Sequence, residues 1–390
     1  MSHAISRSLL PVVVVSLMLA TAACGSDTPP SPAVVREVAR PTPVGPTPSI
    51  AIVPDPTPVA SPSSPVVGPG FWTTTGSMTH GHSYGATVTV LQDGRVLVAG
   101  GEAASGLISA AADLYDPTTD RWAATGKLHS PRRGAVSTLL ADGRVLVTGG
   151  IGGPPRIGEL YDPRTGSWSG TRPMTHPHYA ASVATLPDGH VLVFGGYGDG
   201  YGPTRRAEIY DPSNGTWRAT DSLSTPAGPS AVLADGRVLV LHDVDRPEVF
   251  DPTTARWRAV ARPPSGSYWT AAVRLVNGDV LLLSPRTGTA ATYDPTADTW
   301  TAANGPHTGA GPAVLLDDGT VLVVGNVRSA RFDPSTGAWT DVPRPPLSRD
   351  YALDSVDGVE LNLMAKLHDG RVLATELRSA AVYDPSSGGG

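Results

Sequence analysis

The stretches QDGRVLVAGG (Gln92–Gly101) and YDPTTDRW (Tyr115–Trp122) are the two halves of a repeat, because variants of both recur in alternation along the chain. The first recurs as ADGRVLVTGG (Ala141–Gly150), PDGHVLVFGG (Pro187–Gly196), ADGRVLVLHD (Ala234–Asp243), VNGDVLLLSP (Val276–Pro285), DDGTVLVVGN (Asp317–Asn326) and HDGRVLATEL (His368–Leu377). The second recurs as YDPRTGSW (Tyr161–Trp168), YDPSNGTW (Tyr210–Trp217), FDPTTARW (Phe250–Trp257), YDPTADTW (Tyr293–Trp300), FDPSTGAW (Phe332–Trp339) and the incomplete YDPSSGGG (Tyr383–Gly390). A repeat of about 40–50 residues is typical of propeller blades.

Each repeat predicts four short strands, named A to D in chain order. Strand A precedes the Asp-Gly or Asn-Gly pair, B is the apolar run after it, C ends at the aromatic residue and D carries the tryptophan. Asp-Gly between apolar runs favours a tight hairpin, because glycine adopts positive φ without a steric penalty. Asp-Pro favours the C–D turn, since Pro fixes φ and the carboxylate accepts a backbone N–H. The sequence therefore predicts an all-β fold, a seven-bladed β-propeller with four antiparallel strands per blade, over residues 71–390.

The two ends of the repeat array complement each other. The seventh repeat stops after its aromatic residue, Tyr383, while Trp72 stands in front of the first strand A without strands of its own. We predict that the N-terminal segment supplies strand D of the last blade, because one shared sheet would close the ring and remove two open edges. The in-phase structural tryptophans are then Trp72, Trp122, Trp168, Trp217, Trp257, Trp300 and Trp339.

The Gly-Gly pairs at the ends of the early B strands, followed by an aromatic residue and then Trp, are similar to the kelch motif. The sequence pattern DGRVLVxGG…YDPxTxxW resembles that of bacterial exported kelch proteins and of the propeller of galactose oxidase, over about four-fifths of the chain. Repeats four to seven lack the Gly-Gly pair, so they match less well. The radical copper site of galactose oxidase needs a cysteine cross-linked to a tyrosine inside the propeller. The only cysteine here is Cys24, ahead of the repeats, which excludes that chemistry.

The N-terminus predicts export. Residues 1–23 combine a weakly cationic start with an apolar run, Leu9–Leu19, that is too short to span a bilayer, as in a signal peptide. The small residues before Cys24 resemble a bacterial lipoprotein signal, which implies lipidation of that cysteine; ordinary cleavage with an incidental cysteine is the alternative. The Pro-rich remainder of residues 24–70 predicts an extended linker. We expect a lipoprotein at the cell membrane or cell surface, with a secreted or periplasmic protein as the alternative.

Composition limits the partners. The net charge is −6 and no basic patch is visible, so no nucleic-acid partner is expected, and a membrane is expected to be contacted only through the lipid anchor. One cysteine permits neither an intrachain disulfide nor a zinc site of several thiolates. We expect the chain to act as a monomer.

The lengths of the loops predict which face of the propeller binds a ligand. The A–B and C–D connections are tight and share one face, the turn face; the D–A and B–C connections vary in length and share the other, the variable face. Function concentrates on variable loops held by a rigid frame. The candidate ligand-binding residues on the variable face are His80, His82, His129, Arg132, Arg133, His176, His178, Tyr179, Tyr268, Trp269, Arg349 and Tyr351.

Three roles remain open for these side chains: bracing of the loops, contact with a ligand, and metal ligation. The pairs His80/His82 and His176/His178 have the i, i+2 spacing that lets two rings of an extended segment point the same way. No Asp, Glu or Cys falls at matching positions in these connections, so we predict no metal and no cofactor. Trp269 is the one tryptophan out of phase with the repeat, so the repeat does not explain it.

Function follows from the fold only by analogy. The first hypothesis is a membrane-tethered binding module for protein or glycan that uses the variable face. The second is a carbohydrate-active enzyme similar to the exported kelch-propeller sialate mutarotases, whose chemistry needs only an acid/base group in a pocket. The third is a structural envelope protein. No paired carboxylates or Ser-His-Asp order are seen, so we predict a protein without catalytic residues.

Overall fold

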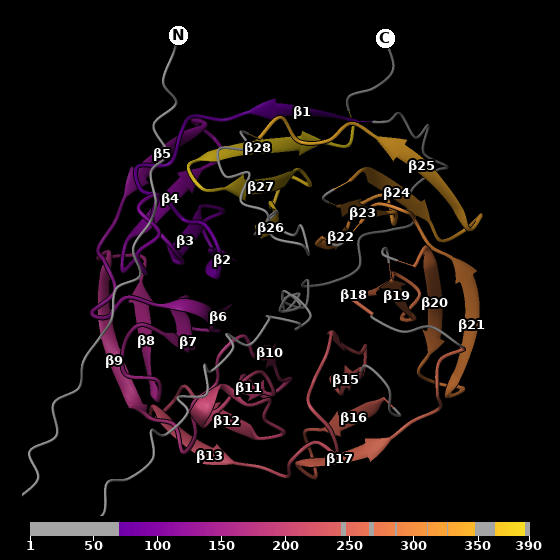
Figure 1. Cartoon of the computed structure of the whole chain (residues 1–390), viewed down its shortest axis with the longest axis horizontal. Helices are drawn as coiled ribbons and strands as arrows, with labels where there is room; N and C mark the ends of the chain where they lie inside the picture. Colours follow the sequence, from indigo (N-terminus) through magenta and orange to yellow (C-terminus); the bar gives the residue numbers. More distant parts are fainter. Residues whose placement is uncertain are drawn as a thin grey trace, which may run out of the picture. The chain divides into compact units, whose positions relative to one another are not determined.

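The computed structural model describes residues 70–242, 247–264, 269–284, 287–309, 311–325, 327–347 and 363–386. These residues form seven four-stranded antiparallel sheets arranged as blades around one axis (Figure 1). The innermost strands contact one another in succession, and β26 of the last blade contacts β2 of the first, so the ring is closed. The predicted all-β, seven-bladed propeller is confirmed.

Every blade runs from strand A at the axis to strand D at the rim. The first four blades consist of β2 (Ala86–Val90), β3 (Val96–Gly100), β4 (Ala112–Asp116) and β5 (Arg121–Ala124); β6 (Arg133–Leu139), β7 (Val145–Ile151), β8 (Ile157–Asp162) and β9 (Ser167–Pro173); β10 (Ser182–Thr185), β11 (Val191–Phe194), β12 (Ala207–Asp211) and β13 (Thr216–Ala219); β14 (Ser230–Val232), β15 (Val238–Val240), β16 (Glu248–Asp251) and β17 (Arg256–Ala259). The last three consist of β18 (Ala271–Arg274), β19 (Val280–Ser284), β20 (Thr289–Asp294) and β21 (Thr299–Asn304); β22 (Ala313–Leu315), β23 (Val321–Val324), β24 (Ser329–Asp333) and β25 (Ala338–Val342); β26 (Leu363–Lys366), β27 (Val372–Glu376), β28 (Ser379–Asp384) and β1 (Phe71–Thr74).

The N-terminal strand completes the last blade, as the sequence predicted. The sheet order is β1-β28-β27-β26, and Trp72 lies directly opposite Tyr383 across the antiparallel pair. Figure 1 shows β1 outside β28 at the rim, although the two strands come from opposite ends of the chain. The turn face also joins the ends: the Arg371 guanidinium of the last blade donates to the Pro117 carbonyl of the first, at 3.0 Å.

Strands B and C supply most of the core. The B strands read as continuous apolar runs because both of their faces are covered by neighbouring blades; Val96, Leu97 and Val98 of β3, for instance, are buried. The aromatic residue of each C strand is also buried and stacks on the Trp opposite it in the same blade, with ring centroids 4.6–5.2 Å apart. Each blade thus holds its own aromatic pair.

The tryptophans also link neighbouring blades. Five of them donate the indole N–H to a backbone carbonyl at or just after the end of strand D of the preceding blade; the pairs are Trp72–Pro343, Trp168–Gly126, Trp257–Asp221, Trp300–Ala261 and Trp339–Asn304. Trp122 donates instead to the hydroxyl of Thr75, which follows β1, at 3.1 Å. The strand from the N-terminus therefore has the same neighbours as any internal strand D.

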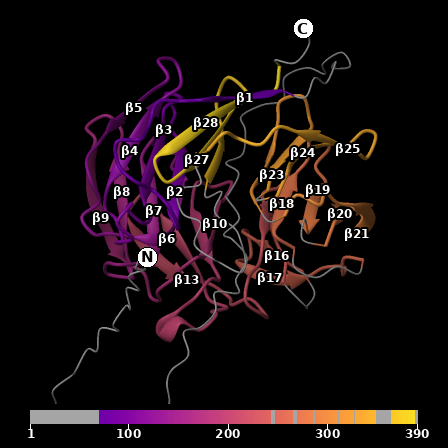
Figure 2. The same cartoon turned by 45° about the horizontal axis from the view of Figure 1, so that its top comes forward.

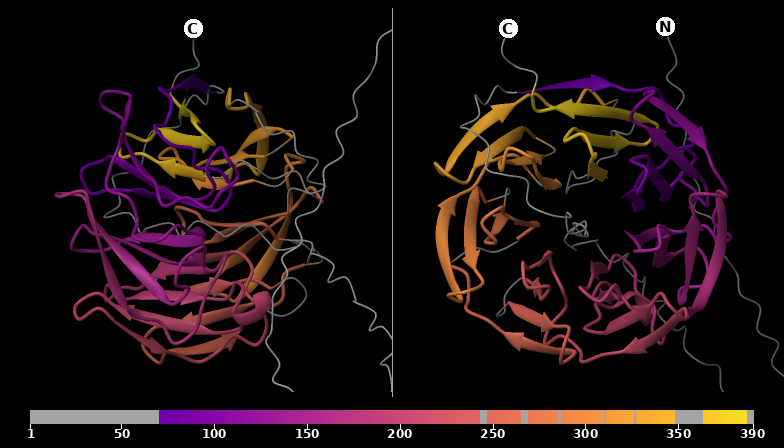
Figure 3. Two further views of the ribbon diagram at one scale, coloured as in Figure 1. Left: turned by 60° about the vertical axis from the view of Figure 1, so that its left-hand side comes forward. Right: turned by 180° about the vertical axis from the view of Figure 1, so that it is seen from behind.

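The structure places the two kinds of connection on opposite faces (Figure 2; Figure 3). On the turn face, Arg95 of an A–B turn donates to the Pro163 carbonyl in the C–D turn of the next blade. On the variable face, D–A and B–C connections bond to each other, as in Ser83 N–H to the Glu102 carbonyl at 2.9 Å. Within the described residues no helix is long and apolar enough to cross a membrane. Residues 1–69, with Cys24, lie outside them.

Candidate functional site

Four buried carboxylates lie beneath the variable face, and the sequence analysis missed them. Asp113, Glu159, Glu208 and Glu248 each stand two positions before the aromatic residue of strand C, in the first four blades. The last three blades have alanine there: Ala291, Ala330 and Ala381. The signal is present in the repeat, as an acid at a fixed offset from Tyr or Phe, but it lies on strand C and not in the variable-face connections.

Each carboxylate holds the D–A connection that leads into its blade. Asp113 accepts the His80 N–H at 2.7 Å, and Glu159 accepts the His129 N–H at 2.7 Å. Glu208 accepts the N–H groups of Thr175 and His176, both at 2.8 Å. Glu248 accepts the Ser224 N–H at 2.9 Å. Buried charge is costly unless it is hydrogen-bonded, and these backbone donors supply the bonds.

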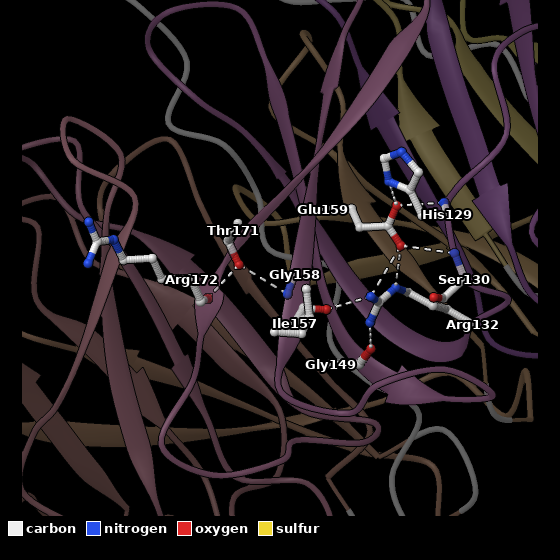
Figure 4. A network of polar contacts seen from close by, with 9 residues as sticks. All are labelled: His129, Ser130, Arg132, Gly149, Ile157, Gly158, Glu159, Thr171 and Arg172. Carbon is white, nitrogen blue, oxygen red and sulfur yellow. Dashed lines mark hydrogen bonds and ion pairs between the residues drawn. The ribbon is translucent and has the colours of Figure 1, made fainter.

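In the second blade the carboxylate is paired with a buried arginine (Figure 4). Arg132 donates Nε and one terminal nitrogen to Glu159 Oε1, each at 3.2 Å, and its other terminal nitrogen to the Gly149 carbonyl at 3.0 Å. His129 packs over the outer side of Glu159, with Nδ1 at 3.0 Å from Oε2. Arg132 is therefore bound internally, and its guanidinium is not offered to a ligand.

Histidines take the place of Arg132 in the first and third blades. His82 Nδ1 lies 2.9 Å from the Gly100 carbonyl, and His178 Nδ1 lies 3.0 Å from the Gly195 carbonyl, the carbonyls that correspond to Gly149. Their Nε2 atoms face Asp113 Oδ2 at 3.5 Å and Glu208 Oε1 at 3.7 Å. Both rings are buried, and among the described residues neither Nε2 has a hydrogen-bond partner.

These contacts make two of the carboxyls more acidic. Burial alone raises the pKa of Glu208, but His178 and the N–H groups of Thr175 and His176 outweigh it and lower the pKa to about 2. Burial likewise raises the pKa of Asp113, while His82 and His80 bring it below its ordinary value. Both carboxylates are ionised at neutral pH and serve as fixed negative charges.

The other described candidates reach the surface to differing degrees. The side chains of His80 and His129 are substantially exposed, and that of His176 less so. Arg133 pairs with Glu102 and lies over the Tyr84 ring, with its guanidinium carbon 5.7 Å from the ring centroid. Tyr179 stacks on Tyr197 of its own blade, with centroids 6.0 Å apart. These residues form a polar and aromatic band on the variable face of the first three blades.

Trp269 lies in the core. It is 3% exposed and packs with Leu241, Val260 and Leu282 in the cluster between the fourth and fifth blades, which gives this out-of-phase tryptophan a structural role. Tyr268, Arg349 and Tyr351 lie outside the described residues.

A cleft lies beside this band on the third blade. It has a volume of about 220 Å³, and its walls come from the D–A and B–C connections of that blade. The lining residues are His176, Pro177, Gly198, Asp199, Gly202, Pro203, Thr204 and Arg206. Imidazole, carboxylate and guanidinium groups thus surround one small concave space.

Most of the exposed large apolar side chains also belong to connections of this face. Tyr84, Leu107, Tyr201 and Val327 all belong to D–A or B–C connections, and Leu107 and Tyr201 are 70% and 61% exposed. Of the large apolar residues exposed in the described part of the chain, only Phe71 and Val276 lie elsewhere. The variable face therefore combines a cleft with apolar side chains.

One cluster has a composition suited to a metal ion. Ligand atoms of His80, His82 and Asp113 all lie within 4.8 Å of one another, a compactness that no other trio of His, Cys, Asp or Glu reaches among the described residues. The acid of this cluster comes from β4 and not from the D–A connection that carries the two histidines: Asp113 faces His80 and His82 from the neighbouring strand.

Comparison with known proteins supports the repeat type and the fold. Residues 178–224 match the family model of the Kelch motif. This stretch runs from the buried His178 through all four strands of the third blade. No curated protein has a significantly similar sequence.

Two solved structures show the likeness at the level of the whole propeller. One is a novel fungal alcohol oxidase of the AA5 family in complex with copper, with a TM-score of 0.62, 18% identity, and coverage of 81% of this chain and 76% of that one. The other is a streptogramin B lyase, with a TM-score of 0.60, 9% identity, and coverage of 80% and 98%. At these identities the likeness concerns the fold alone.

Proposed function

We propose that this seven-bladed propeller, whose third blade carries a kelch motif, is an exported binding module that engages protein or glycan through its variable face. The observation that carries the proposal is that exposed Tyr84, Leu107 and Tyr201 all belong to connections of that face, which also contains the cleft of the third blade. The opposite face consists of tight turns, in which pairs such as Asp93–Arg95 satisfy one another.

The chemistry of the variable face suits recognition. Tyrosine and arginine contribute most of the binding energy at many interfaces, because they combine apolar area with hydrogen bonding. Tyr84, Arg133 and Tyr201 offer such groups, and the buried braces beneath hold the connections in place. A loop that is already ordered loses little entropy on binding.

The tether belongs to the same proposal. Lipidation of Cys24 would hold the chain at a membrane, and the Pro-rich residues before position 70 would space the propeller from it. Ordinary signal cleavage would instead release a secreted or periplasmic form with the same binding face. We take the propeller to work as a monomer.

A glycan array probed with the full chain tests the glycan arm, with Tyr201→Ala as the site variant. Tyr201 is exposed, so its removal should leave stability nearly unchanged while weakening binding at least about tenfold, as expected for an interface anchor. Val276→Ala is the control, because Val276 is an apolar side chain on the turn face that is at least as exposed as Tyr201. Equal losses from both variants would refute the assignment of the face.

A silent array shifts the test to the protein arm. A photo-cross-linking amino acid at position 201, compared with one at position 276, should give a discrete adduct in whole cells only from the variable face. Adducts from neither position would favour a structural envelope protein. A sugar that binds and is chemically converted would favour the mutarotase-type alternative.

A further inference from the structure

The segment between β1 and β2 crosses the place where the ring closes. It leaves the last blade at Thr74 and enters the first at Ala86, and it carries His80 and His82. Two backbone bonds tie it to the B–C connection of the last blade: Met78 N–H to the Arg378 carbonyl at 2.9 Å, and His82 N–H to the Leu377 carbonyl at 2.8 Å. Whatever fixes this segment also fixes the closure of the ring.

The His82 ring has an unmatched nitrogen at this position. Its Nδ1 lies 2.9 Å from the Gly100 carbonyl, which only accepts hydrogen bonds, so Nδ1 carries the proton. In the neutral ring Nε2 then presents a lone pair to Asp113 Oδ2, 3.5 Å away. Both groups are buried, and two facing acceptors in a dry site repel unless a positive charge lies between them.

In the second blade a permanent cation fills the equivalent position. Arg132 occupies the equivalent position and places its guanidinium between the Gly149 carbonyl and Glu159. His82 spans the same carbonyl and carboxylate positions without the fixed charge. The first blade therefore has the negative charge of this arrangement and lacks its permanent positive partner.

We propose that His80, His82 and Asp113 bind a divalent transition-metal ion of the zinc class at the ring closure. Two imidazoles and a carboxylate are ligands that zinc accepts, and bonds of about 2.0–2.2 Å in a tetrahedron place ligand atoms roughly 3.3–3.6 Å apart. The separation of 3.5 Å between His82 Nε2 and Asp113 Oδ2 meets this requirement. His80 Nδ1, now 2.8 Å from Asp113 Oδ1, needs only a rotation of a partly exposed ring to join them.

Two further features favour a metal over a proton. A metal-bound imidazole usually donates its other N–H to a carbonyl, as His82 does to Gly100. His80 is the exposed ligand, so it opens a path for the ion and leaves room for a fourth ligand on the variable face. The ion would join the crossing segment to β4 and stabilise the closed ring. This inference does not depend on the identity of the binding partner.

Titration of the full, metal-free chain with Co²⁺ and Zn²⁺ tests the site. We expect a single tight ion, a visible Co²⁺ spectrum of tetrahedral type, and a melting temperature that rises with Zn²⁺, because the ion binds the folded state. His82→Arg/Asp113→Glu introduces the pair seen at Arg132 and Glu159, so it should fold, lose the Co²⁺ spectrum and melt independently of Zn²⁺.

The third blade offers a matched control. There His176 Nδ1 and His178 Nε2 lie 3.4 and 3.7 Å from the same Glu208 oxygen, and the trio does not reach the compactness of the first. His178→Arg should leave the tight ion in place. His80→Ala removes a partly exposed ring, so it should keep the fold and weaken Co²⁺ binding at least about tenfold. A wild-type chain that binds neither metal, or a double variant that binds as the wild type does, would overturn the proposal.

Discussion

The repeated unit beneath the variable face is a carboxylate two positions ahead of the aromatic residue of strand C. Each of these carboxylates can bind several groups at once. Glu208, for example, accepts two backbone N–H groups and faces two imidazoles. A buried charge so satisfied costs little in the folded state, whereas the removal of one partner leaves the rest unmatched. The contribution of Glu208 to stability therefore depends on whether its carboxyl group is ionised.

Glu208→Gln should be strongly destabilising at neutral pH and much less so in acid. The folded-state pKa of about 2 lies below the ordinary value of 4.5, so the unfolded chain takes up the proton first as the pH falls. The carboxylate thus contributes stability above about pH 4.5, and this contribution, about 3 kcal/mol by the shift, disappears toward pH 2. Urea unfolding at a series of pH values measures it. Wild-type and variant curves that remain parallel from pH 7 to 3 would contradict the ionised brace.

At the scale of the element, strand D does two things at once. Its tryptophan stacks on the aromatic residue of its own blade and, in five blades, donates to a carbonyl of the preceding blade. β1 fulfils both conditions, with Trp72 stacked on Tyr383 at 5.2 Å and bonded to the Pro343 carbonyl at 2.9 Å. The N-terminal strand is thus energetically a normal member of its sheet.

Trp72→Ala and Trp300→Ala should therefore destabilise the protein by similar amounts. Both rings are half-buried and donate to a neighbouring carbonyl, so we expect each loss to fall somewhat below the roughly 3–5 kcal/mol of a fully buried aromatic. Urea midpoints at constant slope give the comparison. A nearly wild-type midpoint for Trp72→Ala alone would mean that the closing strand contributes little.

At the scale of the whole molecule, closure removes the free edges that an open array of blades would have. Besides the β1–β28 pairing, the closing blade is held by Arg371 on the turn face and by the crossing segment on the variable face. Closure thus involves both faces and the rim, and each of these contacts joins residues from opposite ends of the sequence.

Deletion of residues 71–74 should open this closure. The outer edge of β28 would lose its partner, and an unpaired edge strand is a template for association with another chain. We expect a lower melting temperature and a concentration-dependent shift to larger species in light scattering. A deletion variant that stays monomeric with wild-type stability would show that the other contacts suffice.

The repeat, the number of blades, the turns and the shared last blade could all be predicted from the amino-acid sequence. These follow from local rules, since Asp-Gly and Asp-Pro turns, apolar runs and in-phase Trp residues act within about 50 residues and are written once per blade. The resemblance to kelch repeats could also be recognised in the sequence, and residues 178–224 match that motif.

Contacts between side chains of different strands and blades could not be predicted in this way. The tertiary structure places Asp113 of β4 beside His82, turns Arg132 inward and buries Trp269 between two blades. The physical reason is that alternation along a strand assigns a side chain to a face of its sheet, whereas the stacking of twisted sheets decides what that face meets. The sequence shows which residues can donate or accept hydrogen bonds. Which of them become partners depends on how neighbouring blades and connections pack.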